Sequence, residues 1–298
     1  MEHRTSPSSG PLFRGGPIER SGSLANNSLC IALITEVFFD DPTGERLRRA
    51  LVDARSQGAD LALLPEIPLN RWSPASKQVS DADAEELDGW RQLLMAEAAE
   101  SVGIGLVGGA IIRDPDTEIR HNTALLYDGG GACLTRYRKI HLPEEEGYWE
   151  TSHYKPGTEP PKAITGAFSL VVGLQICSDV NRPQGFQILS SGGAEVVFVP
   201  RATPPETYER WRLILRANAI MSGAYVVSTN RPRPEGGAPI GGPSVVIDPF
   251  GHVMMETTDP IAVVRLKRSV VEKARREYPG YLERFPDVYA KGWRKLTE

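Results

Sequence analysis

The chain has 298 residues, of which 40% are hydrophobic and 24% are charged, and its formal net charge is −4. This composition excludes a wholly disordered chain and a coiled coil, and it offers no basic excess for binding a nucleic acid or an anionic membrane. No apolar run approaches the ~20 residues that a membrane-spanning helix needs. The length suits one large domain or two smaller ones.

Three cysteines, at positions 30, 133 and 177, are too few and odd in number to form a disulfide framework. We therefore expect free thiols in a reducing compartment. The N-terminal segment also lacks the apolar stretch that a secretory signal contains. Together these features predict a cytoplasmic protein.

Residues 1–27 are rich in Ser, Gly, Pro and Arg and predict a disordered tail. In residues 28–275, apolar runs alternate with helical patterns, which predicts one α/β domain with helices covering the strands. The expected strands are 29–34, 60–66, 103–112, 122–128, 134–139, 168–177, 194–200, 223–230, 243–249, 251–257 and 261–266. The expected helices are 45–57, 83–101 and 206–222, with two more starting near residues 183 and 270.

Two of these predictions specify how elements pack. The three strands between residues 103 and 139 are expected to be consecutive and antiparallel. The helix at 83–101 is expected to bury one face, formed by side chains at spacings of three and four: Leu87, Trp90, Leu94 and Ala98.

The C-terminal residues 276–298 are rich in aromatic side chains and show no clear helical periodicity. They are expected to form either a strap on their own domain or an arm on a second subunit. The sequence pattern leaves both alternatives open.

Metal and phosphate motifs are absent from the sequence. Its five histidines form none of the spacings that metal sites use. The glycines of residues 103–112 lie inside a strand pattern, and the lysine of a phosphate-binding loop is missing. We therefore expect neither a metal nor a cofactor.

Cys177 ends a long apolar strand pattern, in VVGLQICSDV. Side chains at such strand ends face the crevice where α/β folds bind ligands. A thiol there, near turn amides or a helix N-terminus, is a candidate nucleophile, although a buried cysteine also serves as a small apolar side chain.

Glu66 and Lys139 end two other strand patterns, in LALLPE and LTRYRK. A carboxylate beside Leu, Pro and Ile is costly to bury unpaired, so Glu66 is either a salt-bridged side chain or a general base. Lys139 is either solvated or placed to stabilise an oxyanion.

In order, these three segments resemble the nitrilase superfamily of carbon–nitrogen hydrolases. The family has a Glu in an LPE segment, a Lys in an RKxHLP segment and a Cys in a GxxICxD segment. This chain has LLPE at 63–66, YRKIHLP at 137–143 and GLQICSD at 173–179. Later segments agree with the family as well, and the resemblance spans about residues 29–271.

The resemblance implies a four-layer α-β-β-α sandwich that assembles as a homodimer or larger homo-oligomer. It implies that Cys177 is the nucleophile, Glu66 the general base and Lys139 the cation at the oxyanion. The family often has a second glutamate after the lysine. Glu150, just ahead of the Pro156-Gly157 turn, is its best match, and its rivals are Glu144, Glu145 and Glu146.

The implied reaction is hydrolysis of a C–N bond in a small amide or N-carbamoyl compound, through a cysteine thioester and with release of ammonia. Ser178 follows the nucleophile, where an aromatic residue is frequent in the family, and nitrilases usually have Trp-Glu there. Ser178-Asp179 therefore favours an amide or N-carbamoyl substrate, and a nitrile substrate is the alternative.

The strand ends also indicate which residues line the substrate pocket. Arg182 and Arg201 are candidates to bind a substrate carboxylate, although we expect at least one of them to pair internally with Asp179 or a loop glutamate. The backbone N–H of Ser178 is a candidate oxyanion donor. The remaining pocket candidates are Trp72, Tyr148, Trp149, His153 and Thr203.

Two other interpretations compete with this one. A papain-like pair would join Cys177 to His141. Alternatively, the chain is a catalytically silent binding or scaffold protein that retains the fold, although the presence of Glu66, Lys139 and Cys177 together argues against loss of activity.

Overall fold

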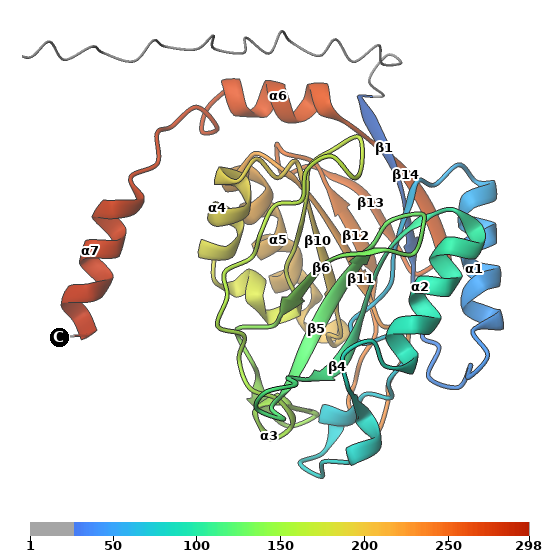
Figure 1. Cartoon of the computed structure of the whole chain (residues 1–298). Helices are drawn as coiled ribbons and strands as arrows, with labels where there is room; N and C mark the ends of the chain where they lie inside the picture. The colour runs from blue at the N-terminus through green and yellow to red at the C-terminus, as the bar shows by residue number, and fades with distance from the viewer. Residues whose placement is uncertain (1–26, 298) are drawn as a thin grey trace, which may run out of the picture.

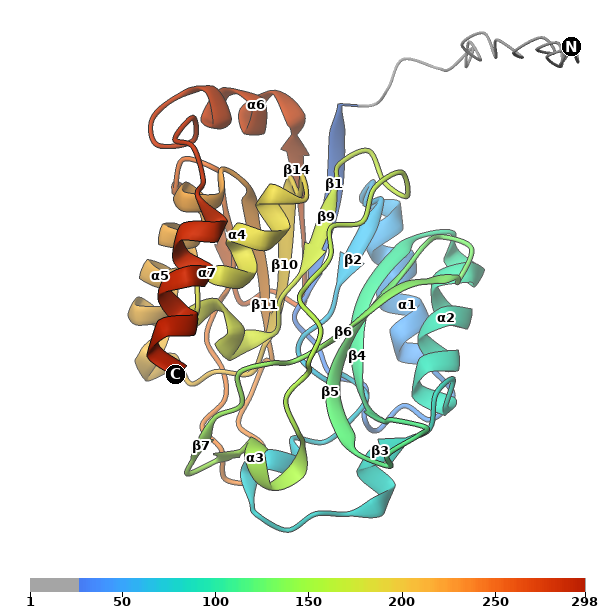
Figure 2. The same cartoon turned by 60° about the vertical axis from the view of Figure 1, so that its left-hand side comes forward.

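The computed structural model describes residues 27–297, so the disordered tail predicted for residues 1–27 lies outside the described residues apart from Asn27. Two β-sheets face each other, and helices cover the outer side of each (Figures 1 and 2). The predicted α-β-β-α sandwich is therefore confirmed.

The first sheet has the strand order β14-β1-β2-β4-β5-β6, and β3 pairs with β4 outside this path. β1, β2 and β4 run parallel, whereas β4, β5 and β6 are consecutive and antiparallel, as predicted. The strands are β1 (Ser28–Ile34), β2 (Leu61–Leu63), β3 (Ala84–Glu85), β4 (Gly105–Arg113), β5 (Arg120–Tyr127), β6 (Cys133–Arg138) and β14 (Ile261–Lys267).

The second sheet has the order β13-β12-β11-β10-β9, with β9, β10 and β11 parallel. Its strands are β9 (Val172–Leu174), β10 (Val196–Arg201), β11 (Tyr225–Asn230), β12 (Ser244–Ile247) and β13 (Val253–Thr257). β10 and β11 are buried along their whole length, which explains the apolar runs with which they begin, VVFV in β10 and YVV in β11.

Three apolar layers hold the sandwich together. Between the sheets, side chains such as Leu63 of β2 and Phe198 of β10 form one core. A second core packs the first sheet against α1 (Glu45–Ser56) and α2 (Trp90–Val102), and a third packs the second sheet against α4 (Gln184–Ser191) and α5 (Tyr208–Ser222). Figure 2 shows these two helix pairs on opposite sides of the molecule.

The connections contain shorter elements. The β7–β8 hairpin (Glu144–Glu145 and Tyr148–Trp149) leads directly into α3 (Glu150–His153). A 3₁₀ turn, η3 (Cys177–Asn181), follows β9 and precedes α4, which begins where a helix was expected. α6 (Arg268–Arg276) follows β14, also as expected.

The helix predicted at 83–101 begins only at Trp90. Residues 84–85 instead pair with β4 as β3. The Glu85 carboxylate accepts hydrogen bonds from the backbone N–H groups of Arg91 and Gln92, so α2 begins after this residue. The predicted buried face is also partly wrong. Leu87 and Trp90 are 46% and 45% exposed, and the apolar side chains that α2 buries include Met95 and Ala98.

The strand predicted at 168–177 is shorter than expected. Only Val172–Leu174 pair with β10. The chain then leaves the sheet, and Cys177 is the first residue of η3. An apolar run does not distinguish a strand from a buried extended segment, because both bury alternate side chains in the same core.

The C-terminal segment contains a helix that the pattern did not predict, α7 (Pro286–Thr297). Proline is favoured at the first helical position, and Val288, Tyr289, Trp293 and Leu296 follow at helical spacings. Gly292 interrupts this pattern. α7 stands apart from the rest of the molecule on the side of α4 (Figure 1).

Candidate active site

The three predicted catalytic side chains follow strands of the two facing sheets. Glu66 comes after β2, Lys139 directly after β6, and Cys177 three residues after β9. All three are buried, with exposed fractions of 1%, 0% and 4%. The ends of these strands therefore bring a carboxylate, an ammonium and a thiol into one closed region.

Lys139 lies at the centre of a buried ionic cluster. Its Nζ donates to Glu66 Oε1 at 2.8 Å and to both carboxylate oxygens of Glu150 at 2.6 and 2.7 Å. Asn122 Nδ2 donates to the same Glu66 oxygen at 2.8 Å, whereas Glu66 Oε2 is buried and has no partner among the described residues. One oxygen of Glu66 is thus held in place and the other is available as a proton acceptor.

Glu150, and none of its three rivals, reaches Lys139. Glu144, Glu145 and Glu146 are exposed, as expected for solvated loop charges. Glu150 is 1% exposed because the β7–β8 hairpin turns the chain inward and starts α3 at this residue.

Cys177 begins the η3 turn in a strained backbone conformation. Its φ angle is +43°, and that of Ile67, next to Glu66, is +40°. Such values are rare for residues with a Cβ and concentrate at functional sites. The Cys177 thiol contacts the backbone carbonyl of Ala202 at 3.9 Å.

The electrostatics of the cluster connect the three groups. Burial raises the pKa of the Cys177 thiol well above its usual value, the Glu66 carboxylate raises it further, and the Lys139 ammonium opposes both. Burial lowers the pKa of Lys139, but the Glu150 and Glu66 carboxylates outweigh this effect, so that the pKa is raised well above its ordinary value. Cys177 is therefore a neutral thiol at neutral pH and needs a base to become a nucleophile.

Sequence reasoning missed two residues that shape the Glu66 segment. One is Asn122, whose amide donor faces Glu66, and the other is Arg231, which donates to the backbone carbonyls of Glu66 and Ile67 at 2.8 and 2.9 Å. Arg231 also forms a buried ion pair with Glu235 at 2.7 Å. An Asn within β5 and an Arg just past β11 carry no local signal, because their partners are distant in the chain.

Asp179 joins the nucleophile turn to the segment after Lys139. Its carboxylate accepts from the Tyr137 hydroxyl at 2.8 Å, from the backbone N–H of His141 at 2.9 Å and from that of Ile176 at 3.2 Å. The His141 ring is bonded to the same carboxylate at 2.9 Å. This partner places His141 in a structural role, and the papain-like pair with Cys177 is not supported.

The two candidate arginines lie in different environments. Arg182 is exposed and donates to the Asn181 carbonyl. Arg201 is fully buried and donates to Ser228 Oγ at 3.0 Å, to Thr203 Oγ1 and to the Pro243 carbonyl, and burial lowers its pKa to about 10. Neither forms an ion pair within residues 27–297, so the expected internal pairing is wrong for both.

The other predicted binding residues are placed as follows. Trp149 is partly exposed, and its ring lies beneath the Lys77 ammonium at 4.0 Å. Tyr148, its neighbour on β8, is buried instead. Thr203 is buried and its backbone N–H donates to Asn230 Oδ1, while the Ser178 hydroxyl donates to the His141 carbonyl.

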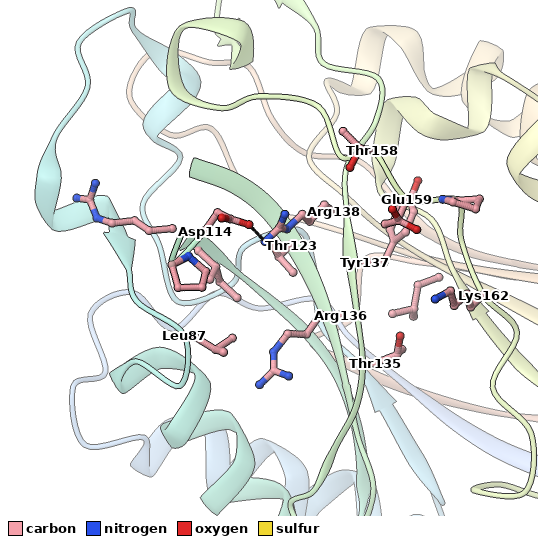
Figure 3. Close-up of a pocket in the computed structure, with 15 residues that line it drawn as sticks. Leu87, Asp114, Thr123, Thr135, Arg136, Tyr137, Arg138, Thr158, Glu159 and Lys162 are labelled. Atoms are coloured by element: carbon pink, nitrogen blue, oxygen red, sulfur yellow. Dashed lines mark hydrogen bonds and ion pairs between the residues drawn. The ribbon is translucent and has the colours of Figure 1, made fainter. Parts of the chain in front are cut away.

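A cavity of about 430 Å³ lies along β6 (Figure 3). Its lining includes Arg138 and Tyr137 but none of the four catalytic candidates. Arg138 is already paired with Asp114 at 2.7 Å. The cavity is therefore separate from the cluster around Lys139.

Comparison with known proteins identifies the family of this chain. The family model for carbon-nitrogen hydrolases matches residues 29–276. The omega-amidase of Homo sapiens is 28% identical over 247 residues, which cover 80% of this chain and 87% of that protein. The 2-oxoglutaramate amidase of Bacillus subtilis is 24% identical over 262 residues, covering 82% and 93%.

A solved structure is similar over nearly the whole chain. The amidase from Nesterenkonia sp. is 28% identical with a TM-score of 0.73, and the match covers 92% of this chain and 99% of that one. Together, the sequence match, the fold and the buried Glu-Lys-Cys arrangement show that this chain belongs to the carbon-nitrogen hydrolase family, as an enzyme of the amidase type.

Proposed function

We propose that Cys177, Glu66, Lys139 and Glu150 together hydrolyse a small amide or N-carbamoyl compound through a thioester. The observation that carries this proposal is the buried cluster in which Lys139 holds one oxygen of Glu66 at 2.8 Å, while the other oxygen has no partner within residues 27–297. A purely structural ion pair gains nothing from a buried, unsatisfied carboxylate oxygen, because leaving it unpaired costs free energy.

In the first step, Glu66 takes the thiol proton as the Cys177 sulfur attacks the amide carbon. The carbonyl π electrons move to the oxygen, and the resulting oxyanion is stabilised by the Lys139 ammonium and by the backbone N–H of Ser178. Removing one such donor typically costs about 3 kcal/mol of transition-state stabilisation. Glu150 keeps the ammonium in position through its two short hydrogen bonds.

In the second step, Glu66 returns the proton to the amide nitrogen, the C–N bond breaks and ammonia leaves. Glu66, again ionised, then takes a proton from water as the water oxygen attacks the thioester carbon. The C–S bond breaks, the sulfur regains a proton from Glu66 and the acid product leaves. One glutamate thus acts as base and acid in alternate steps.

The substrate is proposed to enter beside Cys177, with Trp149, Arg182, Arg201 and Thr203 as further binding candidates. The relatives named omega-amidase and 2-oxoglutaramate amidase support a small amide. Arg201 is a buried guanidinium whose hydrogen-bond partners are all neutral. This environment favours a substrate with a polar group near Arg201.

Ammonia release from a panel of aliphatic amides, N-carbamoyl amino acids and nitriles tests the proposal. We expect turnover of amides or N-carbamoyl compounds, and a loss of about 10⁴-fold or more in Cys177→Ala. Cys30→Ala is the matched control, because Cys30 is equally buried but lies in β1 and should leave turnover unchanged. Turnover of nitriles alone would contradict the proposal.

We also propose a homodimer in which residues 277–297 pack on the partner subunit. Exposed apolar side chains of this size and number on one segment are typical of an interface. They include Tyr278, Tyr281, Phe285, Val288, Tyr289, Trp293 and Leu296, which are 54–79% exposed. On the neighbouring helices, Ile188 and Leu213 are 46% and 67% exposed.

Light scattering of the full chain and of a chain ending at Arg276 tests this assembly. We expect a dimer for the full chain and a lower mass or weaker association for the truncated one. A monomeric full chain at micromolar concentration contradicts the proposal.

The cytoplasm is the proposed location. The three free cysteines support a reducing compartment. Within residues 27–297, no helix is long and apolar enough to cross a membrane.

A further inference from the structure

The Tyr148 side chain is buried beside the catalytic cluster, and its hydroxyl has no partner in the described part of the chain. It is 7% exposed, and its ring packs edge-on against Trp72 with 5.9 Å between centroids. Among residues 27–297 no group hydrogen-bonds to its hydroxyl. A buried hydroxyl normally finds a partner, so its absence here requires an explanation.

The position of Tyr148 ties it to the reacting groups. It is two residues ahead of Glu150, and it belongs to an apolar cluster that also contains Ile67, the neighbour of Glu66, and Ala202. The carbonyl of Ala202 is the group that the Cys177 thiol contacts. Burial raises the pKa of Tyr148, and the Glu66 carboxylate adds to this effect.

The charge around the hydroxyl limits what it can bind. Glu66, Glu145 and Glu206 all act on Tyr148 and disfavour negative charge at its oxygen. A carboxylate placed there would meet the same repulsion, whereas a neutral carbonyl oxygen accepts a hydrogen bond without it.

We infer that the Tyr148 hydroxyl donates to an uncharged carbonyl oxygen on the acyl chain of the substrate, so that the preferred substrate is a small amide with a second, neutral carbonyl group. This inference rests on the proposed amidase reaction and names the substrate class for the same site. Tyr148 is then a residue that determines specificity, with no part in the proton transfers of Glu66.

The test compares two amides of equal length, butyramide and acetoacetamide, which differ by a carbonyl in place of one methylene. The ratio of their kcat/KM values in wild type and in Tyr148→Phe cancels the different intrinsic reactivity of the two amides. We expect Tyr148→Phe to lower the acetoacetamide-to-butyramide ratio about tenfold, because the substrate carbonyl loses its donor. The Tm should stay unchanged or rise, since an unpartnered hydroxyl is removed.

Tyr154→Phe is the matched control. Tyr154 lies in the same apolar cluster, but its hydroxyl already bonds to Ser73 Oγ at 3.3 Å. This variant should lower the Tm and leave the ratio unchanged. Equal losses for both amides in Tyr148→Phe would overturn the inference.

A third amide, malonamate, tests the charge argument. A selective loss for this carboxylate in Tyr148→Phe, without one for acetoacetamide, overturns the uncharged acceptor. If wild type hydrolyses neither these amides nor any amide or N-carbamoyl compound of the panel above, the proposed function fails. If it hydrolyses only N-carbamoyl compounds, the inference about Tyr148 fails and the proposed function stands. If it hydrolyses the amides and the ratio does not move, only the role of Tyr148 fails.

Discussion

Two buried ionic networks in the first sheet differ in how completely they are satisfied. At the start of α2, Glu85 accepts from Arg91 and Gln92 with both oxygens, and Arg91 also donates to the backbone carbonyls of Leu69 and Ala82. Around Lys139, one oxygen of Glu66 has no partner among the residues that the structure describes.

The two regions also differ in backbone conformation. Asp88, in the Glu85 network, has a φ angle of 59°, but aspartate is one of the residue types that adopt such values readily. Near Lys139, Cys177 and the β-branched Ile67 have φ angles of 43° and 40°, which are much rarer for these residue types. A network that only stabilises the fold pairs every buried charge, because each unpaired group costs free energy. An unpaired oxygen and two strained residues in one place therefore mark the region built for chemistry.

The sharpest test of this contrast replaces each glutamate by its amide. Glu66→Gln should reduce turnover about 10³-fold, because the general base is lost, and change stability by about 1 kcal/mol or less. Glu85→Gln should keep turnover but lose about 3–5 kcal/mol, because it leaves the Arg91 charge buried and unpaired. Ammonia release and urea unfolding measure the two effects, and equal losses of turnover in both variants would break the comparison.

Replacing the buried arginines Arg231 and Arg91 by lysine should have a smaller effect on turnover. Lysine cannot reproduce the fork with which Arg231 reaches the carbonyls of Glu66 and Ile67, so Arg231→Lys should displace Glu66. We expect kcat to fall about tenfold with KM nearly unchanged. Arg91→Lys should lose stability while kcat stays within twofold. Steady-state kinetics at one pH decides the point, and a change in KM alone contradicts a positioning role.

The smallest effect is a pH dependence of stability. Burial raises the pKa of Glu150 from 4.5 to about 8, with Glu66 adding to the shift and Lys139 opposing it. Between these values the folded chain binds more protons than the unfolded chain, so the Glu150 contribution to stability falls as pH rises. Lys139 adds no slope there, because its pKa is raised well above 10.5.

Urea unfolding between pH 5 and pH 8 measures this slope. Relative to wild type, Glu150→Gln should become comparatively more stable as pH increases. Parallel curves for the two chains would show that Glu150 titrates alike in the folded and unfolded states.

Most of the fold could be predicted from the sequence. Buried strands such as β10 read as continuous apolar runs, and the antiparallel β4-β5-β6 unit follows from short connections between consecutive strands. The errors fall where local pattern and tertiary contact compete. α2 begins later than predicted, where the Glu85 carboxylate bonds to its first backbone N–H groups. β9 ends earlier than predicted, because the chain turns away from the sheet before Cys177.

Part of the candidate site could also be predicted, namely the residues that follow the strands. Glu66, Lys139 and Cys177 were identified by position and by resemblance to a family, and the structure brings the first two within hydrogen-bonding distance. Glu150 was preferred over its three rivals because it precedes the Pro156-Gly157 turn, and in the structure it is buried whereas they are exposed. Asn122 and Arg231 gave no signal, because a hydrogen bond between residues 56 or 165 positions apart leaves no local pattern.

The order of apolar runs and turns determined the sandwich, since hydrophobic burial acts on each segment according to its own composition. Which side chains meet at the end of that sandwich was decided only by the packing of the two sheets. Charge pairing, unpaired donors and acceptors and backbone strain depend on distances across the fold, and those distances exist only in the folded chain.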